Sequence, residues 1–238
     1  MTTLNLWRRP LADLPADVWD RTDVTVLILA ETGLTEVPPA VGALQRLRTL
    51  DLGHNKLAAL PAELGDLTDL RDFLYLHDNG LFTLPETLGR LTALRYLNVG
   101  ENRLRELPST IGDMASLVEL RAQYNRLAAL PDSIGRLGAL RELWLRENRL
   151  STLPASIGDL ANLRELDLRE NHLTELPPPL AGLPLLRRLD VRSNRIATFP
   201  PWLAELPALE KLDLRWNPVT PAPVLLEALT ARGCEVLY

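Results

Sequence analysis

The sequence has 238 residues, of which 46% are hydrophobic and only 5% aromatic. Its 26 basic and 31 acidic residues are interspersed, so the balance of charge argues against binding to nucleic acid or to a membrane surface. The single cysteine, Cys234, excludes an intrachain disulfide and favours a reducing compartment. We find neither a secretory signal nor the ~18 consecutive apolar residues of a membrane span. A cytoplasmic location is therefore expected.

An internal repeat of 23 residues runs through the chain. The most regular position of the repeat is an asparagine. Successive asparagines are 23 residues apart, except that the first two are separated by 24 residues. The asparagines are Asn55, Asn79, Asn102, Asn125, Asn148, Asn171, Asn194 and Asn217. A proline follows six positions after each, and the proline column begins two units earlier, at Pro15, so ten units fill the chain. This regularity predicts one elongated domain over residues 1–238.

The unit at residues 140–158, LRELWLRENRLSTLPASIG, shows what each repeated position does. Leu143 and Leu145 stand two residues apart, and this alternation predicts a short strand with both leucines facing the core. Asn148 follows where its amide can hydrogen-bond the backbone of neighbouring turns, so stacked copies form a ladder. Pro154 fixes the backbone as the chain starts back over the other side, and the glycine that ends the unit is expected to allow a tight corner.

The pattern LxxLxLxxNxLxxLPxxIGxLxx resembles the 23-residue, Ras-group class of intracellular leucine-rich repeats, and we expect a bacterial cytosolic member. The resemblance implies an α/β solenoid, a right-handed arc with about ten parallel strands on its concave face and short helical or irregular segments outside. It also implies a monomeric, non-catalytic scaffold or adaptor that binds a protein or peptide and needs no cofactor. A regulatory or substrate-recognition module of a ligase or small-GTPase system, with its catalytic part on another chain, stays open as the alternative.

Both ends of the array depart from the pattern and are predicted to be caps, because terminal repeats would otherwise expose core leucines and strand edges. Residues 1–23 form a degenerate first unit, residues 24–217 the regular repeats and residues 218–238 the C-terminal cap. In the first unit the fitting positions are Leu4, Leu6, Leu11 and Leu14. In the last segment we predict a helix, followed by a strand from Cys234 to Tyr238. The helical stripe consists of Val224, Leu225, Ala228 and Leu229.

The extra residue of the 24-residue interval lies within residues 70–85. Keeping the leucines in register places it between Arg71 and Phe73, most simply at Asp72, and predicts a bulge entering the strand. A second register, with Asp78 as the ladder residue, misplaces more leucines, so we prefer the first.

Strand residues that alternate with the leucines are expected to form columns on the concave face. In the fourth to seventh strands these columns gather aromatic and basic side chains, the types enriched at binding hot spots. The candidate partner-binding residues are Phe73, Tyr75, His77, Tyr96, Arg121, Tyr124, Trp144 and Arg146. Aromatic anchors would grip a peptide or loop, while the arginines would select an acidic group. The competing interpretation is that the aromatics pack around the bulge and fill gaps beside Gly53 and Gly100.

The eighth to tenth strands instead carry one column of aspartates beside one of arginines. These residues are Asp167, Asp190 and Asp213 with Arg169, Arg192 and Arg215, and we interpret them as a mutually neutralising charge lattice. His54 and His77 lie on adjacent strands but in different columns, so no metal site is predicted. No Ser/His/Asp set, paired-carboxylate cleft or phosphate-binding loop stands out, and no catalytic residue is assigned.

Overall fold

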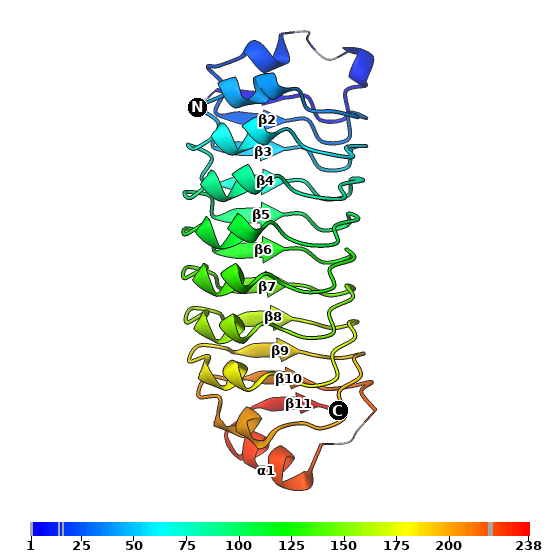
Figure 1. The fold of residues 1–238 in the computed structure, drawn as a ribbon, viewed down its shortest axis with the longest axis vertical. Coiled ribbons are helices and arrows are strands. Elements are labelled where there is room, and N and C mark those ends of the chain that lie inside the picture. The colour runs from blue at the N-terminus through cyan, green and yellow to red at the C-terminus, as the bar shows by residue number, and fades with distance from the viewer. Residues whose placement is uncertain (1, 14, 16, 219–220) are drawn as a thin grey trace.

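The computed structural model describes residues 2–13, 15, 17–218 and 221–238, and within these ranges it contains one sheet of parallel strands stacked in chain order (Figure 1). The strands are β1 (Thr3–Asn5), β2 (Val26–Ile28), β3 (Thr49–Asp51), β4 (Phe73–Tyr75), β5 (Tyr96–Asn98), β6 (Glu119–Arg121), β7 (Glu142–Trp144), β8 (Glu165–Asp167), β9 (Arg188–Asp190), β10 (Lys211–Asp213) and β11 (Glu235–Leu237). The predicted parallel array is thus confirmed. The described part has eleven strands because β11, the predicted final strand, joins the same sheet as the ten repeat strands.

Short 3₁₀ helices form the opposite side of each turn. They span Leu11–Asp13, Val18–Asp20, Pro39–Ala43, Ala62–Asp66, Glu86–Arg90, Ser109–Asp113, Asp132–Arg136, Ala155–Asp159, Pro178–Gly182 and Pro201–Glu205. From the second repeat onward the proline of the repeat stands directly before the helix, as Pro131 does with φ −68° and ψ 148°. Its ring fixes φ near this value and its carbonyl accepts the first i to i+3 bond, from Ile134 N–H at 3.0 Å. One proline per unit therefore starts each return segment.

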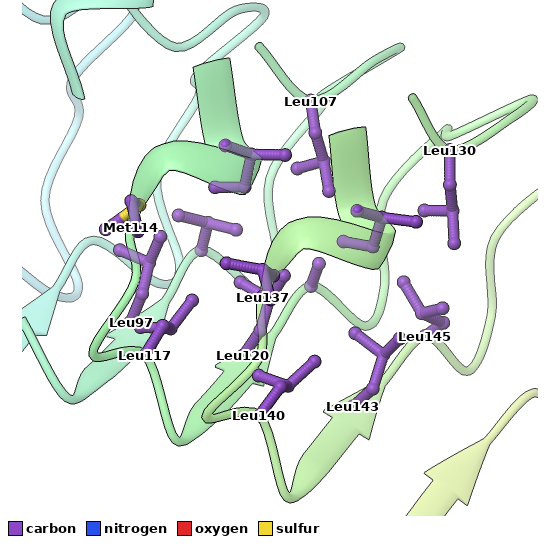
Figure 2. Close-up of a cluster of buried hydrophobic side chains, with 14 of the residues drawn as sticks. Leu97, Leu107, Met114, Leu117, Leu120, Leu130, Leu137, Leu140, Leu143 and Leu145 are labelled. Atoms are coloured by element: carbon purple, nitrogen blue, oxygen red, sulfur yellow. The ribbon is translucent and has the colours of Figure 1, made fainter. Parts of the chain in front are cut away.

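The core lies between the sheet and these helices and is a continuous stack of aliphatic side chains (Figure 2). The middle residue of each regular strand is a leucine, and equivalent leucines lie side by side because neighbouring strands pair without offset, as Leu120 does with Leu143. Both are fully buried. Burial of a leucine side chain contributes about 1.5–3 kcal/mol, so each repeat is stabilised chiefly through its two neighbours.

The glycine near the end of most of the 3₁₀ helices is needed for close packing between repeats. A Cβ atom added to Gly112 would overlap the backbone carbonyl of Ser133 in the next repeat, and one on Gly135 would overlap that of Ser156. Neither glycine has a positive φ, so the expectation that these glycines permit a tight corner is wrong. They keep the helices of adjacent turns close together.

The repeated asparagines lie beneath the strand ends and bond the backbone of two turns. In the typical case of Asn148, Nδ2 donates hydrogen bonds to the carbonyls of Ala122 at 2.9 Å and Leu145 at 3.0 Å. Its Oδ1 accepts a hydrogen bond from the backbone N–H of the residue 21 positions earlier. Asn79 makes the equivalent bonds, which settles the register around the insertion and excludes Asp78 as the ladder residue. Because these carbonyls and amides are buried, the side chains replace the water that would otherwise satisfy them.

The insertion lies directly before β4, as predicted. Arg95 N–H donates to the carbonyl of Arg71 at 3.1 Å and bypasses Asp72, whose own N–H donates to Arg48 O at 2.9 Å. Residues 71 and 72 thus stand opposite one residue of the next turn, which is a bulge. From Phe73 onward the pairing with both neighbouring strands is regular.

Both ends are covered by the predicted segments. Thr32 takes the place of an asparagine in the second repeat, where its N–H and hydroxyl both donate to Asn55 Oδ1 at 3.1 Å. At the other end, helix α1 (Pro223–Ala231) buries Leu225 and Leu229. The predicted stripe is wrong for Val224, which is 73% exposed because it lies on the outer side of the helix. Leu14 lies outside the described residues. In the described segments, no helix is long and apolar enough to cross a membrane.

Candidate functional site

The face of the sheet opposite the leucine core, which we call the open face, carries the first and third residues of each strand. The aromatic centre is the part of this face formed by Phe73, Tyr75, Tyr96, Arg121 and Trp144. Because neighbouring strands pair without offset, equivalent residues lie side by side. Phe73 thus lies next to Tyr96 among the first strand residues, and Arg121 next to Trp144 among the third. Strands β4 to β7 therefore present them on one continuous surface.

The three phenyl-type rings of the aromatic centre contact one another. Phe73 and Tyr75 stack with centroids 5.8 Å apart, and Tyr96 meets Phe73 at 5.5 Å and Tyr75 at 5.2 Å. These are favourable separations for aromatic pairs. Burial among them raises the pKa of Tyr96 to about 12, so its hydroxyl stays protonated at neutral pH. Phe73 nevertheless remains 42% exposed, which is unusual for so large an apolar side chain.

Arg121 connects these rings to Trp144. Its Cζ atom lies 5.8 Å from the Tyr96 ring centroid and 5.5 Å from that of Trp144, within the range of cation–π contacts. Its Nε donates to Glu119 Oε1 at 2.5 Å. The charge of this guanidinium group is therefore already paired with a carboxylate of the same chain. This geometry weakens the expectation that Arg121 selects an acidic group on a partner.

His77 extends the aromatic centre toward β3. Its ring lies 5.9 Å from Tyr75, and its Nε2 is 3.2 Å from Nε2 of His54, whose Nδ1 approaches Asp78 Oδ2 at 2.7 Å. Burial, followed by the nearness of His54, lowers the pKa of His77. The sequence did not show that the two histidines touch, because their positions differ by one residue in the repeat. No group of three or more metal-ligating side chains occurs among the described residues.

Tyr124 and Arg146 form a separate pair at the ends of the strands. The Arg146 guanidinium lies 4.6 Å from the Tyr124 ring centroid. Tyr124 directly precedes its ladder asparagine and has a positive φ of 55°, so it leaves the sheet in the turn after β6. These two predicted site residues thus lie at the rim of the open face, whereas the other six form a continuous chain of contacts.

Filling of the gaps beside the two glycines accounts for His77 but not for Phe73, Tyr75 and Tyr96. The space above Gly53 is occupied by the ring of His77, and that above Gly100 by the side chain of Gln123. Phe73, Tyr75 and Tyr96 are absent from the nearest neighbours of either glycine.

A row of three glutamates crosses the open face beside the aromatic centre and was not among the predicted site residues. Glu119, Glu142 and Glu165 are the first residues of β6, β7 and β8, and each pairs directly with the next. Burial raises the pKa of Glu165, and Glu142 and Glu119 raise it further by repulsion. The signal was present in the sequence as three consecutive glutamates in one column. We call these residues the glutamate row.

Beyond β8 the open face has a different character. Arg192 donates to both carboxylate oxygens of Asp190, at 3.1 and 2.6 Å, and Arg215 does the same to Asp213, at 3.0 and 2.7 Å. Arg169 is less well paired, because its Nε lies 3.4 Å from Asp167 Oδ2. Burial and then Asp190 raise the pKa of Asp167 to about 7. A hollow of about 550 Å³ lies over this region and extends to Trp144.

Comparison with known protein families identifies the repeats. A model described as a leucine-rich repeat region matches residues 62–152 and 132–230, more than half of the chain. A second model, for a single leucine-rich repeat, matches residues 46–67. The chain belongs to the leucine-rich repeat family. Its sequence matches none of the curated proteins with which it was compared.

Several solved structures resemble this leucine-rich repeat chain. The ectodomain of the plant membrane receptor kinase GASSHO1/SCHENGEN3 from Arabidopsis thaliana, in complex with CASPARIAN STRIP INTEGRITY FACTOR 2, has a TM-score of 0.74 and 34% identity over 82% of this chain and 24% of its own. The plant peptide hormone receptor RGFR1 in complex with RGF2 has a TM-score of 0.71 and 25% identity over 94% and 45%. An internalin from Listeria monocytogenes has a TM-score of 0.60 and 20% identity over 100% and 80%, a likeness of fold alone. The present chain spans less than half of the two plant chains.

Proposed function

We propose that this chain is a non-catalytic binding module that holds another protein or a peptide on its open face, with the aromatic centre as the anchor. The observation that carries the proposal is the aromatic centre itself. Four adjacent strands bring Phe73, Tyr75, Tyr96, Arg121 and Trp144 onto one surface, where Arg121 lies between the rings of Tyr96 and Trp144. Large aromatic and arginine side chains dominate the energetics of most protein interfaces.

The rigidity of the scaffold supports this role. Each anchor belongs to a strand whose middle leucine is fully buried and whose end is tied down by the asparagine ladder, so the side chains are ordered before a partner arrives. Preorganisation of this kind reduces the entropy that association costs. The complexes of the two similar plant receptors also support a binding role, while leaving the ligand of this chain open.

The finer assignment that we propose is a monomeric cytoplasmic adaptor of the 23-residue, Ras-group class, from a bacterium. The 23-residue spacing, which is broken only by the one 24-residue interval, supports the class, and the lone Cys234, buried in the C-terminal cap, supports a reducing compartment. The mixed charge of the chain favours a protein partner over nucleic acid.

The test is a double variant, Tyr75→Ala with Trp144→Ala, used with the wild type to capture partners from a lysate of the native cells. A partner identified by mass spectrometry and then purified should bind the double variant at least ~30-fold more weakly, because about 2 kcal/mol is typical of lost hot-spot anchors. The matched control is Phe82→Ala, which removes an aromatic side chain that is 44% exposed outside the strands. If the double variant binds as well as the wild type but melts at a lower temperature, the aromatics serve packing and the proposal fails.

A further inference from the structure

The glutamate row places three like charges at adjacent positions of neighbouring strands. Glu119, Glu142 and Glu165 are directly paired in the parallel register, so their backbones are separated by the ~4.8 Å spacing of strands. Like charges directly opposite each other destabilise a sheet. The row therefore works against the stability of the fold unless other charges compensate it.

The two ends of the row form ion pairs, whereas the middle residue, Glu142, has only the more distant charge of Arg121. Glu119 accepts a hydrogen bond from Arg121 at 2.5 Å, and Glu165 lies 3.7 Å from Arg188. Within the described residues Glu142 forms no ion pair, and its carboxylate accepts only the indole N–H of Trp144, at 3.3 Å. The row thus already pairs with two guanidinium groups and leaves one carboxylate without an ion-pair contact among the described residues.

The surroundings of Glu142 have the composition of a site for a positive charge. The outward residues within strands β3 to β8 comprise five carboxylates, Asp51, Glu119, Glu142, Glu165 and Asp167, against the guanidinium of Arg121, with Arg146 and Arg169 two residues beyond the ends of β7 and β8. Arg121 lies near the ring of Trp144. The hollow that includes this ring is lined by six acidic residues, Glu165, Asp167, Asp190, Glu210, Asp213 and Glu235, and by five basic ones, Arg169, Arg188, Arg192, Lys211 and Arg215. An aromatic ring beside carboxylates is a favourable environment for an ammonium or guanidinium group.

We propose that the glutamate row and the aromatic centre together recognise a basic protein segment, which seats a lysine or arginine between Trp144 and the Glu142 and Glu165 carboxylates. This inference rests on the proposed function and names the chemistry of its partner. Apolar side chains of the same segment lie on Phe73 and Tyr96, which with Glu119 line a second hollow of about 270 Å³. Charge complementarity favours a basic partner over an acidic one. The two arginines that were expected to hold an acidic ligand are already in contact with Glu119 and Tyr124.

The experiment is a selection of random 12-residue peptides displayed on phage against the purified full chain, followed by affinity measurement with synthetic copies of the enriched peptides. We expect enrichment of lysine or arginine next to aromatic or aliphatic residues. Glu142→Gln and Glu165→Gln should each weaken binding by about tenfold, and raised ionic strength should weaken it further. The matched control is Glu106→Gln, at an exposed glutamate outside the strands, which should bind like the wild type.

The outcomes separate this inference from the proposed function. Peptides that lose binding to Tyr75→Ala with Trp144→Ala, yet lack basic residues and tolerate Glu142→Gln, would overturn the inference and leave the proposed function standing. If no peptide is enriched, or if the enriched peptides bind both sets of variants equally well, both proposals fail. Circular dichroism of each variant verifies that it folds, and Glu165→Gln provides an independent reading should Glu142→Gln fold poorly.

Discussion

The aromatic centre and the charge lattice occupy equivalent positions of the same sheet but satisfy their polar groups in opposite ways. In the lattice, Arg192 and Arg215 each bind both oxygens of an aspartate two residues earlier in their own turn. In the centre, aromatic rings contact one another, and in the adjoining glutamate row Glu142 forms no ion pair among the described residues. Arg192 and Arg215 of the lattice are thus paired within the chain, whereas Glu142 beside the centre is not.

The comparison shows how a repeat scaffold separates folding from recognition. The leucines, glycines and asparagines that build each turn are the same under both regions, so the outward residues are free to differ. A region whose charges are internally paired gains little from a partner, since a partner would have to break those pairs. A region with exposed rings and uncompensated carboxylates gains from one. Substitutions in each region test whether folding and recognition are separated in this way.

The ladder should be equally important under both regions. Asn125→Ala beneath the centre removes bonds to Val99 O at 2.9 Å and from Leu104 N–H at 2.9 Å, and Asn194→Ala beneath the lattice removes the equivalent bonds. We expect each change to lower the free energy of unfolding by about 2–3 kcal/mol, because buried backbone groups lose their partners. Urea denaturation measures this. Asn162→Ala, at an exposed asparagine, is the control, and a difference above about 1 kcal/mol between the two ladder sites would contradict a common scaffold.

Breaking the lattice should destabilise the protein. Asp213 is 4% exposed and binds Arg215 through two hydrogen bonds, with Arg192 at 3.4 Å. Asp213→Ala leaves both guanidinium groups without this carboxylate, and we expect a loss of about 2 kcal/mol, less than for a fully buried pair because the arginines are partly exposed. Thermal unfolding monitored by circular dichroism is the measurement. Asp213→Glu, which keeps the charge, should recover part of the loss, and full stability of Asp213→Ala would mean that the lattice contributes nothing.

The sequence was sufficient to predict the parallel array, because leucine spacing and the asparagine column determine which residues face the core in every turn. It also located the insertion before β4, since one extra residue shifts all later leucines. The sequence could not show that Val224 lies on the outer side of α1, which depends on how the helix docks on the last repeat. The sequence also did not show the role of Gly112, because that role depends on the distance between successive turns.

The open face was predictable as columns of residues but not as a pattern of satisfied and unsatisfied charges. Whether Arg121 reaches Glu119 or a partner depends on its rotamer, and the contact between His54 and His77 depends on the positive φ of 54° at His54. The sequence thus indicated which side chains face outward. The binding role of the aromatic centre stays a prediction until a partner is measured.

Asp167 stands at the border of the two regions, next to Trp144 in the register, and should make stability depend on pH. Burial and Asp190 raise its pKa in the folded state to about 7, above the ordinary value of 3.8. Between these values the folded protein binds more protons than the unfolded chain, so stability from this group is fully present below pH ~4 and is lost as the pH rises through ~7. Asp167→Asn removes this loss and should be roughly 1–4 kcal/mol more stable than the wild type at pH 7, where the upper figure is the full linkage of about three pKa units, with little difference at pH 4. A constant difference between pH 4 and pH 7 would show that Asp167 does not titrate in this range.

The smallest effect should have the opposite sign to that of the lattice. Glu142→Gln removes the middle charge of the glutamate row but keeps an oxygen that accepts the Trp144 indole N–H, so packing is preserved while repulsion from Glu119 and Glu165 falls. We expect the free energy of unfolding to rise by roughly 0.2–0.5 kcal/mol at low ionic strength, with the gain shrinking as salt screens the repulsion. Glu106→Gln, made at a glutamate outside the strands, should leave stability unchanged. A clear loss of stability in Glu142→Gln would mean that this carboxylate already has a compensating charge within the folded chain. The centre would then be as complete as the lattice, and the reason for expecting a basic partner there would disappear.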